Sequence, residues 1–108
     1  MPGTLPQRGN ILCGFTIGPT YTPAQVAGAT TAEQTFTQVG MKAGDAVSVS
    51  TALAQTAGIF IAYARCVVND QLIICFGNVT AGALTPISGQ YVLSIERPEN
   101  TALAPNSL

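Results

Sequence analysis

Residues Ile59–Phe76 carry the strongest structural signal in the chain: Ile-Phe-Ile-Ala-Tyr-Ala-Arg-Cys-Val-Val-Asn-Asp-Gln-Leu-Ile-Ile-Cys-Phe. Two runs of apolar, β-branched and aromatic residues flank Asn69-Asp70, and Asn and Asp tolerate the positive φ angles of tight turns. This pattern predicts a β-hairpin in which Asn69-Asp70 is a two-residue loop. The cross-strand pairs expected from that loop are Val67–Leu72, Arg65–Ile74 and Tyr63–Phe76.

Both faces of this hairpin are apolar in the expected register. A half-solvated hairpin alternates apolar with polar residues, so each face here needs a cover. The core of the domain would cover one face, and a neighbouring subunit is a candidate cover for the other. One face would carry Ile59, Ile61, Tyr63, Val67, Leu72, Ile74 and Phe76, and the other Phe60, Ala62, Ala64, Cys66, Ile73 and Cys75.

The remaining chain predicts short strands separated by Gly- and Pro-containing turns. Gly40 and Gly44 suit unusual dihedral angles in a turn over residues 39–45. Residues 52–58 are too few for a stable helix, so we expect a loop there. Residues 77–89 form a long connection whose Val79 and Leu84 would cap the core. The expected strands, besides the hairpin, are residues 24–28, 31–38, 46–51 and 90–97. Alternation in the last of these would turn Tyr91, Leu93 and Ile95 inward, and alternation in 31–38 would place Thr35 and Thr37 on the face opposite Phe36. These features predict an all-β domain over residues 24–98, a small antiparallel β-sandwich or jelly-roll-like barrel.

The N-terminal residues 1–23 predict an extended arm, because four prolines interrupt any regular element. A disordered tail is the alternative, but apolar side chains in this segment are costly to leave in water. An arm that lies along a partner explains both the prolines and the apolar residues. The arm residues expected to contact a partner or a neighbouring subunit are Ile11, Leu12, Phe15 and Ile17. Residues 99–108 predict a polar surface tail.

Composition restricts the class of partner. Charged residues are 8% of the 108 residues, and apolar residues are 47%, whereas charged residues are about a quarter of a typical soluble domain. A neutral β domain coated with Thr, Ser and Gln is one interpretation, and a subunit covered by partners is the other. The four Lys and Arg residues form no basic run, so we expect no nucleic-acid binding. We also expect no membrane span and no secretion signal.

Catalytic and metal-binding patterns are missing from the sequence. The chain has no His, which excludes Ser-His-Asp and Cys-His catalysis, and we expect no metal site and no cofactor. Glu33 and Asp45 come nearest to a glycosidase pair, but we interpret them as solvated strand-end and turn carboxylates. The hairpin register places Cys66 and Cys75 as diagonal neighbours about 7–8 Å apart, too far for a disulfide. We therefore expect buried thiols and no enzymatic activity.

Arg65 is unusual because it lies in mid-strand among apolar residues. Its aliphatic stem could pack while the guanidinium reaches solvent. Alternatively, it is a structural anchor that binds a carboxylate or backbone carbonyl within the fold or across a subunit contact. The acidic partners expected for such an anchor are Glu33, Asp45 and Glu96. Asn78-Val79-Thr80 matches a glycosylation acceptor, but we expect Asn78 to close a loop through side-chain hydrogen bonds.

An ordered set of segments over roughly residues 30–98 resembles small virion structural proteins of tailed bacteriophages, of the capsid cement or head-decoration type. The segments are Thr31-Ala32-Glu33-Gln34-Thr35-Phe36-Thr37, Gly40, Gly44-Asp45, Ala64-Arg65-Cys66-Val67, Phe76-Gly77-Asn78-Val79-Thr80-Ala81-Gly82, Thr85-Pro86, Gly89-Gln90-Tyr91 and Arg97-Pro98. The resemblance implies a homo-oligomer, with a trimer favoured over a dimer, that is made in the bacterial cytoplasm. It further implies binding to the major capsid protein on the outside of the shell, which it would stabilise.

A second functional hypothesis is a fibre- or spike-type module that recognises host surface glycan. Glycan sites present aromatic platforms beside polar groups, and the chain offers three Tyr, four Phe and no Trp. The cement hypothesis predicts binding through buried apolar area, and therefore little dependence on salt. A small enzyme has no support in the sequence.

Overall fold

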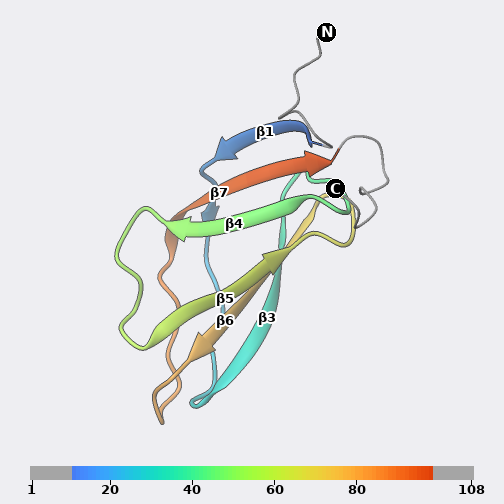
Figure 1. The fold of residues 1–108 in the computed structure, drawn as a ribbon. Coiled ribbons are helices and arrows are strands. Elements are labelled where there is room, and N and C mark those ends of the chain that lie inside the picture. Colours follow the sequence, from blue (N-terminus) through green and yellow to red (C-terminus); the bar gives the residue numbers. More distant parts are fainter. Residues whose placement is uncertain (1–10, 99–108) are drawn as a thin grey trace, which may run out of the picture.

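The computed structural model describes residues 11–98, which form seven β-strands and no helix (Figure 1). Each strand matches a stretch rich in β-branched, aromatic or Thr residues, which favour the pleated surface of a sheet. The strands are β1 (Ile11–Ile17), β2 (Thr20–Tyr21), β3 (Thr30–Thr37), β4 (Ala46–Thr51), β5 (Ile59–Arg65), β6 (Gln71–Asn78) and β7 (Gly89–Pro98).

The strands form two antiparallel sheets that pack as a small sandwich. In the first sheet β7 is central, with β4 along one side and β1 followed by β2 along the other. The second sheet has the order β3-β6-β5. This arrangement confirms the all-β sandwich expected from the spacing of the strands.

The core lies between the two central strands, β6 and β7. Leu72, Ile74 and Phe76 project from β6, and each is fully buried. Tyr91, Leu93 and Ile95 project from β7 and are at most 1% exposed, as the alternation in the sequence predicted. Phe76 meets Tyr91 edge to face, with ring centroids 6.3 Å apart, so the two sheets interlock through aromatic as well as aliphatic contacts.

The expected register of the central hairpin is wrong. Arg65 lies opposite Ile73, and Tyr63 opposite Cys75, so each pair is shifted by one residue. The connection spans residues 66–70 rather than two residues, although Asp70 has the positive φ of 66° expected there. Asp70 donates its backbone N–H to the Met41 carbonyl at 2.9 Å. The connection is therefore shaped by bonds to the neighbouring turn, which local turn preferences cannot reveal.

A second irregularity, a β-bulge between Ile61 and Tyr63, changes which side chains of β5 face outward. Ile59 and Ile61 face the core before the bulge, and Ala64 faces it afterwards. Because side chains alternate along a strand, Tyr63 and Arg65 point away from the core. The predicted assignment of Tyr63 to the same face as Leu72, Ile74 and Phe76 is therefore wrong.

Cys66, just after β5, and Cys75 in β6 lie on opposite sides of the β3-β6-β5 sheet. Cys66 belongs to the core cluster, whereas Cys75 lies opposite Tyr63 on the outer side. The expectation that they are diagonal neighbours on one face is wrong for the same register reason. Both are buried free thiols, as expected.

The expected N-terminal arm is not separate from the sandwich in its described part. β1 and β2 pair with β7 of the same chain, and Phe15 and Ile17 pack against the core. These two side chains are partly buried against the core of this chain, so the core accounts for part of their apolar surface, and their contact with a partner stays a prediction. Ile11 and Leu12 belong to β1. Residues 1–10 and the expected tail at 99–108 lie outside the described range.

Other local predictions have mixed outcomes. Gly40 and Gly44 have φ angles of 98° and 94°, which confirms their role in the turn. Residues 24–28 form no strand and contribute only an isolated bridge between Val26 and Leu84. Val79 is 72% exposed, so the prediction that it caps the core is wrong.

Candidate functional site

Conventional catalytic or metal-binding arrangements are not found among the described residues. Across residues 11–98 no three His, Cys, Asp or Glu side chains gather into a possible metal site. The same residues contain no helix long and apolar enough to cross a membrane.

The outer face of the β3-β6-β5 sheet, called the outer sheet face below, combines aromatic and charged side chains. The register aligns them in three rows across the strands: Thr31, Gly77 and Phe60; Glu33, Cys75 and Tyr63; and Thr35, Ile73 and Arg65. Phe60 is 44% exposed and Tyr63 is 46% exposed. Large exposed aromatic residues on one sheet face are a typical feature of a binding surface.

The ring of Phe60 lies across the central strand above Gly77. A Cβ atom at Gly77 would lie only 2.1 Å from Cζ of the ring, so no larger residue fits beneath it. The glycine thus allows Phe60 to lie against the sheet while its other side remains open to solvent. Gly77 itself is buried by this contact.

Tyr63 crosses the same central strand in the next row and reaches β3. Its hydroxyl donates a hydrogen bond to Oε2 of Glu33, and Cys75 in the row between them is 4% exposed. This hydrogen bond to the Glu33 carboxylate, supported by burial, raises the pKa of Tyr63 to about 12. Tyr63 therefore stays neutral across the physiological pH range.

Arg65 binds the same carboxylate. Its Nη2 donates to both oxygens of Glu33, at 3.0 and 2.9 Å. The hydrogen bonds from Tyr63 and Arg65 lower the pKa of Glu33, so this carboxylate remains ionised. Glu33 is one of the three partners expected for Arg65, and the two charges neutralise each other on the outer sheet face.

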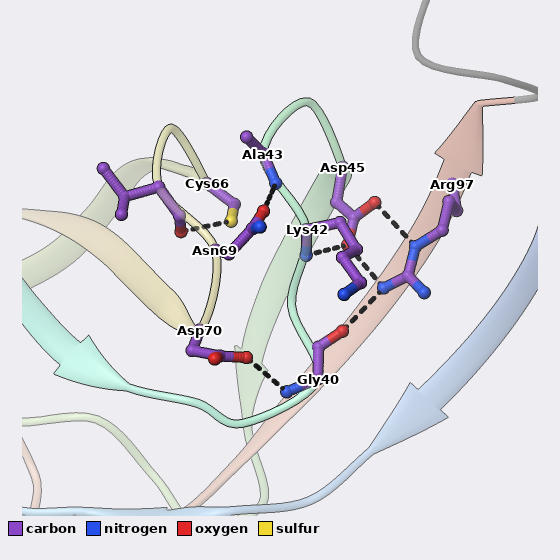
Figure 2. A network of polar contacts seen from close by, with 9 residues as sticks. Gly40, Lys42, Ala43, Asp45, Cys66, Asn69, Asp70 and Arg97 are labelled. Atoms are coloured by element: carbon purple, nitrogen blue, oxygen red, sulfur yellow. Dashed lines mark hydrogen bonds and ion pairs between the residues drawn. The ribbon is translucent and has the colours of Figure 1, made fainter.

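A second polar cluster lies at the end of the sandwich, where the 39–45 turn meets the 66–70 connection (Figure 2). Arg97 donates from Nε and Nη2 to Asp45, at 3.0 and 2.8 Å, and from Nη2 to the Gly40 carbonyl at 2.9 Å. Asp70 and Asn69 accept backbone N–H bonds from Gly40 and Ala43. These hydrogen bonds hold the 39–45 turn against β7 on one side and against the 66–70 connection on the other.

Asp45 is 5% exposed, so its interpretation as a solvated turn carboxylate is wrong. Burial opposes its ionisation, but hydrogen bonds from Arg97 and from the Lys42 N–H outweigh that effect and lower the pKa of Asp45. The Arg97 guanidinium also lies 5.3 Å from the centre of the Phe15 ring. These contacts serve the stability of the fold, and Glu33 lies in the separate cluster with Tyr63 and Arg65.

Asn78 has the loop-closing role that the sequence predicted. Its side-chain amide donates to the carbonyls of Val26 and Gly82, at 3.1 and 2.9 Å. Its carbonyl oxygen accepts from the backbone N–H and the hydroxyl of Thr80, at 2.9 and 2.7 Å. Asn78 is 2% exposed, so in the folded protein its amide is not accessible for glycosylation.

Of the predicted contact residues, only Arg65 lies on the outer sheet face. Phe15 and Ile17 lie between the sheets, while Ile11 and Leu12 are placed only as part of β1. Sequence reasoning named Glu33 as one possible partner of Arg65, but it missed Tyr63 as the second donor to the Glu33 carboxylate because it assigned Tyr63 to the inner face. A signal was available, because Tyr63 is two residues from Arg65 and an outward Arg65 implies an outward Tyr63.

Comparison with known proteins gives no relative: no family model matches the chain, and neither does any curated protein or solved structure.

Proposed function

We propose that this protein is a capsid cement or decoration protein of a tailed bacteriophage, which binds the outside of the major capsid shell and stabilises it. It acts as a homo-oligomer, with a trimer favoured over a dimer, and has no catalytic role. The observation that carries the proposal is the outer sheet face. Phe60 and Tyr63 expose apolar area there, and the paired Glu33 and Arg65 leave the face without net charge.

The size of this face defines what else binding needs. Three strands about 4.8 Å apart and about eight residues long give a face of roughly 400 Å². A typical stable interface uses about 800 Å² per partner. The outer sheet face alone therefore supplies about half of the area of a typical interface. We propose that the exposed valines at one end of the same sheet belong to the binding surface as well. Val39, Val67 and Val68 are 79%, 53% and 50% exposed and follow β3 or connect β5 to β6.

Cosedimentation with purified capsid shells tests the proposal. The protein should sediment with shells at both low and high salt, since apolar contacts are little affected by screening. Phe60→Ala should weaken binding by removing an exposed ring, whereas the matched control Val79→Ala removes exposed apolar area at the other end of the sheet. Release of the protein by salt, or equal weakening by both substitutions, would contradict this mode of binding.

The outer sheet face also supports one alternative function, recognition of host surface glycan by a fibre or spike module. Phe60 and Tyr63 lie across the central strand with exposed area beside a carboxylate and a guanidinium, and sugars stack on such rings while their hydroxyls bind polar groups. A glycan array distinguishes the two functions. Saturable binding of a glycan that Arg65→Met abolishes, without binding to shells, would favour the alternative.

A further inference from the structure

Protein sheets protect their edge strands from joining other chains, and three of the four long edges here have another segment of this chain beside them. β4 and β5, which are edge strands of different sheets, lie close to each other (Figure 1). The segment at Ala24 lies beside β3, where the Gln34 side chain accepts from the Ala24 N–H at 2.7 Å and donates to the Ala24 carbonyl at 2.8 Å. The remaining edge is that of β1.

β1 pairs with β7 on one side, and no described strand pairs with its other side. Its sequence, Ile-Leu-Cys-Gly-Phe-Thr-Ile, contains no charged residue and no proline. Natural edge strands usually carry such residues, because they prevent pairing between molecules. The one protecting feature of β1 is a β-bulge between Ile11 and Cys13. The regular part of the strand after it lacks such features, and nothing in its charge repels a second copy of the same strand.

The hydrogen-bond phase of β1 identifies the groups that face outward. Phe15 lies opposite Ile95 and Ile17 lies opposite Leu93, so the same register places Pro19 opposite Tyr91. This last pair is hydrogen-bonded, because the Tyr91 N–H donates to the Pro19 carbonyl at 2.8 Å. Hydrogen-bonded and non-bonded pairs alternate along antiparallel strands. Phe15 and Ile17 thus direct their backbone groups toward β7, and the exposed Gly14 and Thr16 direct theirs away from it.

We propose that two copies of the chain pair through β1 in antiparallel orientation about a two-fold axis at Phe15. Gly14 of each copy lies opposite Thr16 of the other, so the outward N–H and C=O groups of both residues meet partners and join the two sheets. The partly buried Phe15 rings meet on the core side of the joined sheet. This pairing does not use the outer sheet face and is independent of capsid binding: it concerns the free protein in solution, whereas the trimer proposed above is the assembly on the shell.

Sedimentation equilibrium of the full chain over a wide concentration range tests the pairing. We expect a monomer–dimer equilibrium. Thr16→Pro removes one outward N–H per copy without removing a bond to β7, and should raise the dissociation constant by roughly tenfold or more. Thr16→Val is the matched control, since it changes the side chain but keeps the N–H, and it should leave the dimer intact.

Hydrogen exchange of the wild-type protein provides a readout that needs no variant. The amides of Gly14 and Thr16 should exchange slowly in the dimer and faster after dilution. A protein that stays monomeric at all concentrations would overturn the proposal. An oligomer that Thr16→Pro leaves unchanged would also overturn it. Protection of both amides that does not depend on concentration would overturn it too, because it would mean that the chain covers its own edge.

Discussion

Asp45→Ala is the substitution whose effect on stability the structure defines best. Asp45 accepts two hydrogen bonds from Arg97 and one, at 2.9 Å, from the Lys42 N–H, and its side chain is 1% exposed. Breaking a buried ion pair by removing one partner costs about 3–5 kcal/mol. Because the Arg97 side chain is 21% exposed, water can solvate it after the change, so we expect a loss of about 3 kcal/mol.

Thermal and urea unfolding measure this loss. For a domain of this size, about 3 kcal/mol corresponds to a fall in Tm of roughly 12–24 °C. Asp45→Ala combined with Arg97→Met should recover part of the loss, since the double substitution removes both charges. Glu33→Ala, which removes the carboxylate of the exposed pair, is the control and should change stability much less. A loss below about 0.5 kcal/mol for Asp45→Ala would refute this account of the cluster.

Three further outcomes follow from the same contacts. The pKa of Asp45 is lowered in the folded protein, so its contribution to stability is complete above its unfolded pKa of about 3.9 and is lost as the pH falls through the folded pKa. In an acid titration monitored by circular dichroism, the stability of Asp45→Asn should therefore depend less on pH than that of the wild-type protein. Ultraviolet titration should find Tyr63 neutral up to a pKa of about 12, and Glu33→Gln should bring that pKa closer to 10; an unchanged titration would contradict the hydrogen bond. Gly77→Ala should destabilise the protein by about 1–2 kcal/mol by displacing the Phe60 ring, and the cost should largely vanish in the Phe60→Ala background when measured by urea unfolding.

Alternation of apolar and polar residues was sufficient to predict the regular strands. It predicted the inward residues of β7, Tyr91, Leu93 and Ile95, because every second residue there is large and apolar. It also separated Phe36 of β3 from Thr35 and Thr37, which lie on the opposite, exposed face of the strand. In these strands apolar and polar residues alternate every second position, and side chains alternate between the two faces of a strand with the same period, so local reasoning was adequate.

The central hairpin could not be placed correctly from its sequence, because two local signals were misleading. Asn69-Asp70 is typical of a two-residue turn, but the side chains bind Ala43 and Gly40 of a turn that is distant in the sequence. The bulge near Ala62 follows an uninterrupted apolar run, in which either face could be the inner one. The position of Arg65 was the better guide to the outer sheet face.

The burial of Asp45 was also beyond local reasoning. A carboxylate between Gly44 and Ala46 in a turn is usually solvated, and its partner Arg97 lies 52 residues away in the chain. Phe15 and Ile17 were assigned to an arm because prolines surround them. The structure instead continues this edge of the sheet past Pro19, whose missing N–H leaves its carbonyl free to accept from Tyr91.

The central claim is that the outer sheet face docks on a protein shell through apolar contact. Hydrogen exchange of the protein, free and bound to capsid shells, tests it most directly. We expect slower exchange on binding in β5, β6 and the 66–70 connection, and the same protection at high salt. Protection confined to β1 and β7, or none in β5 and β6 when the protein is bound, would contradict the claim.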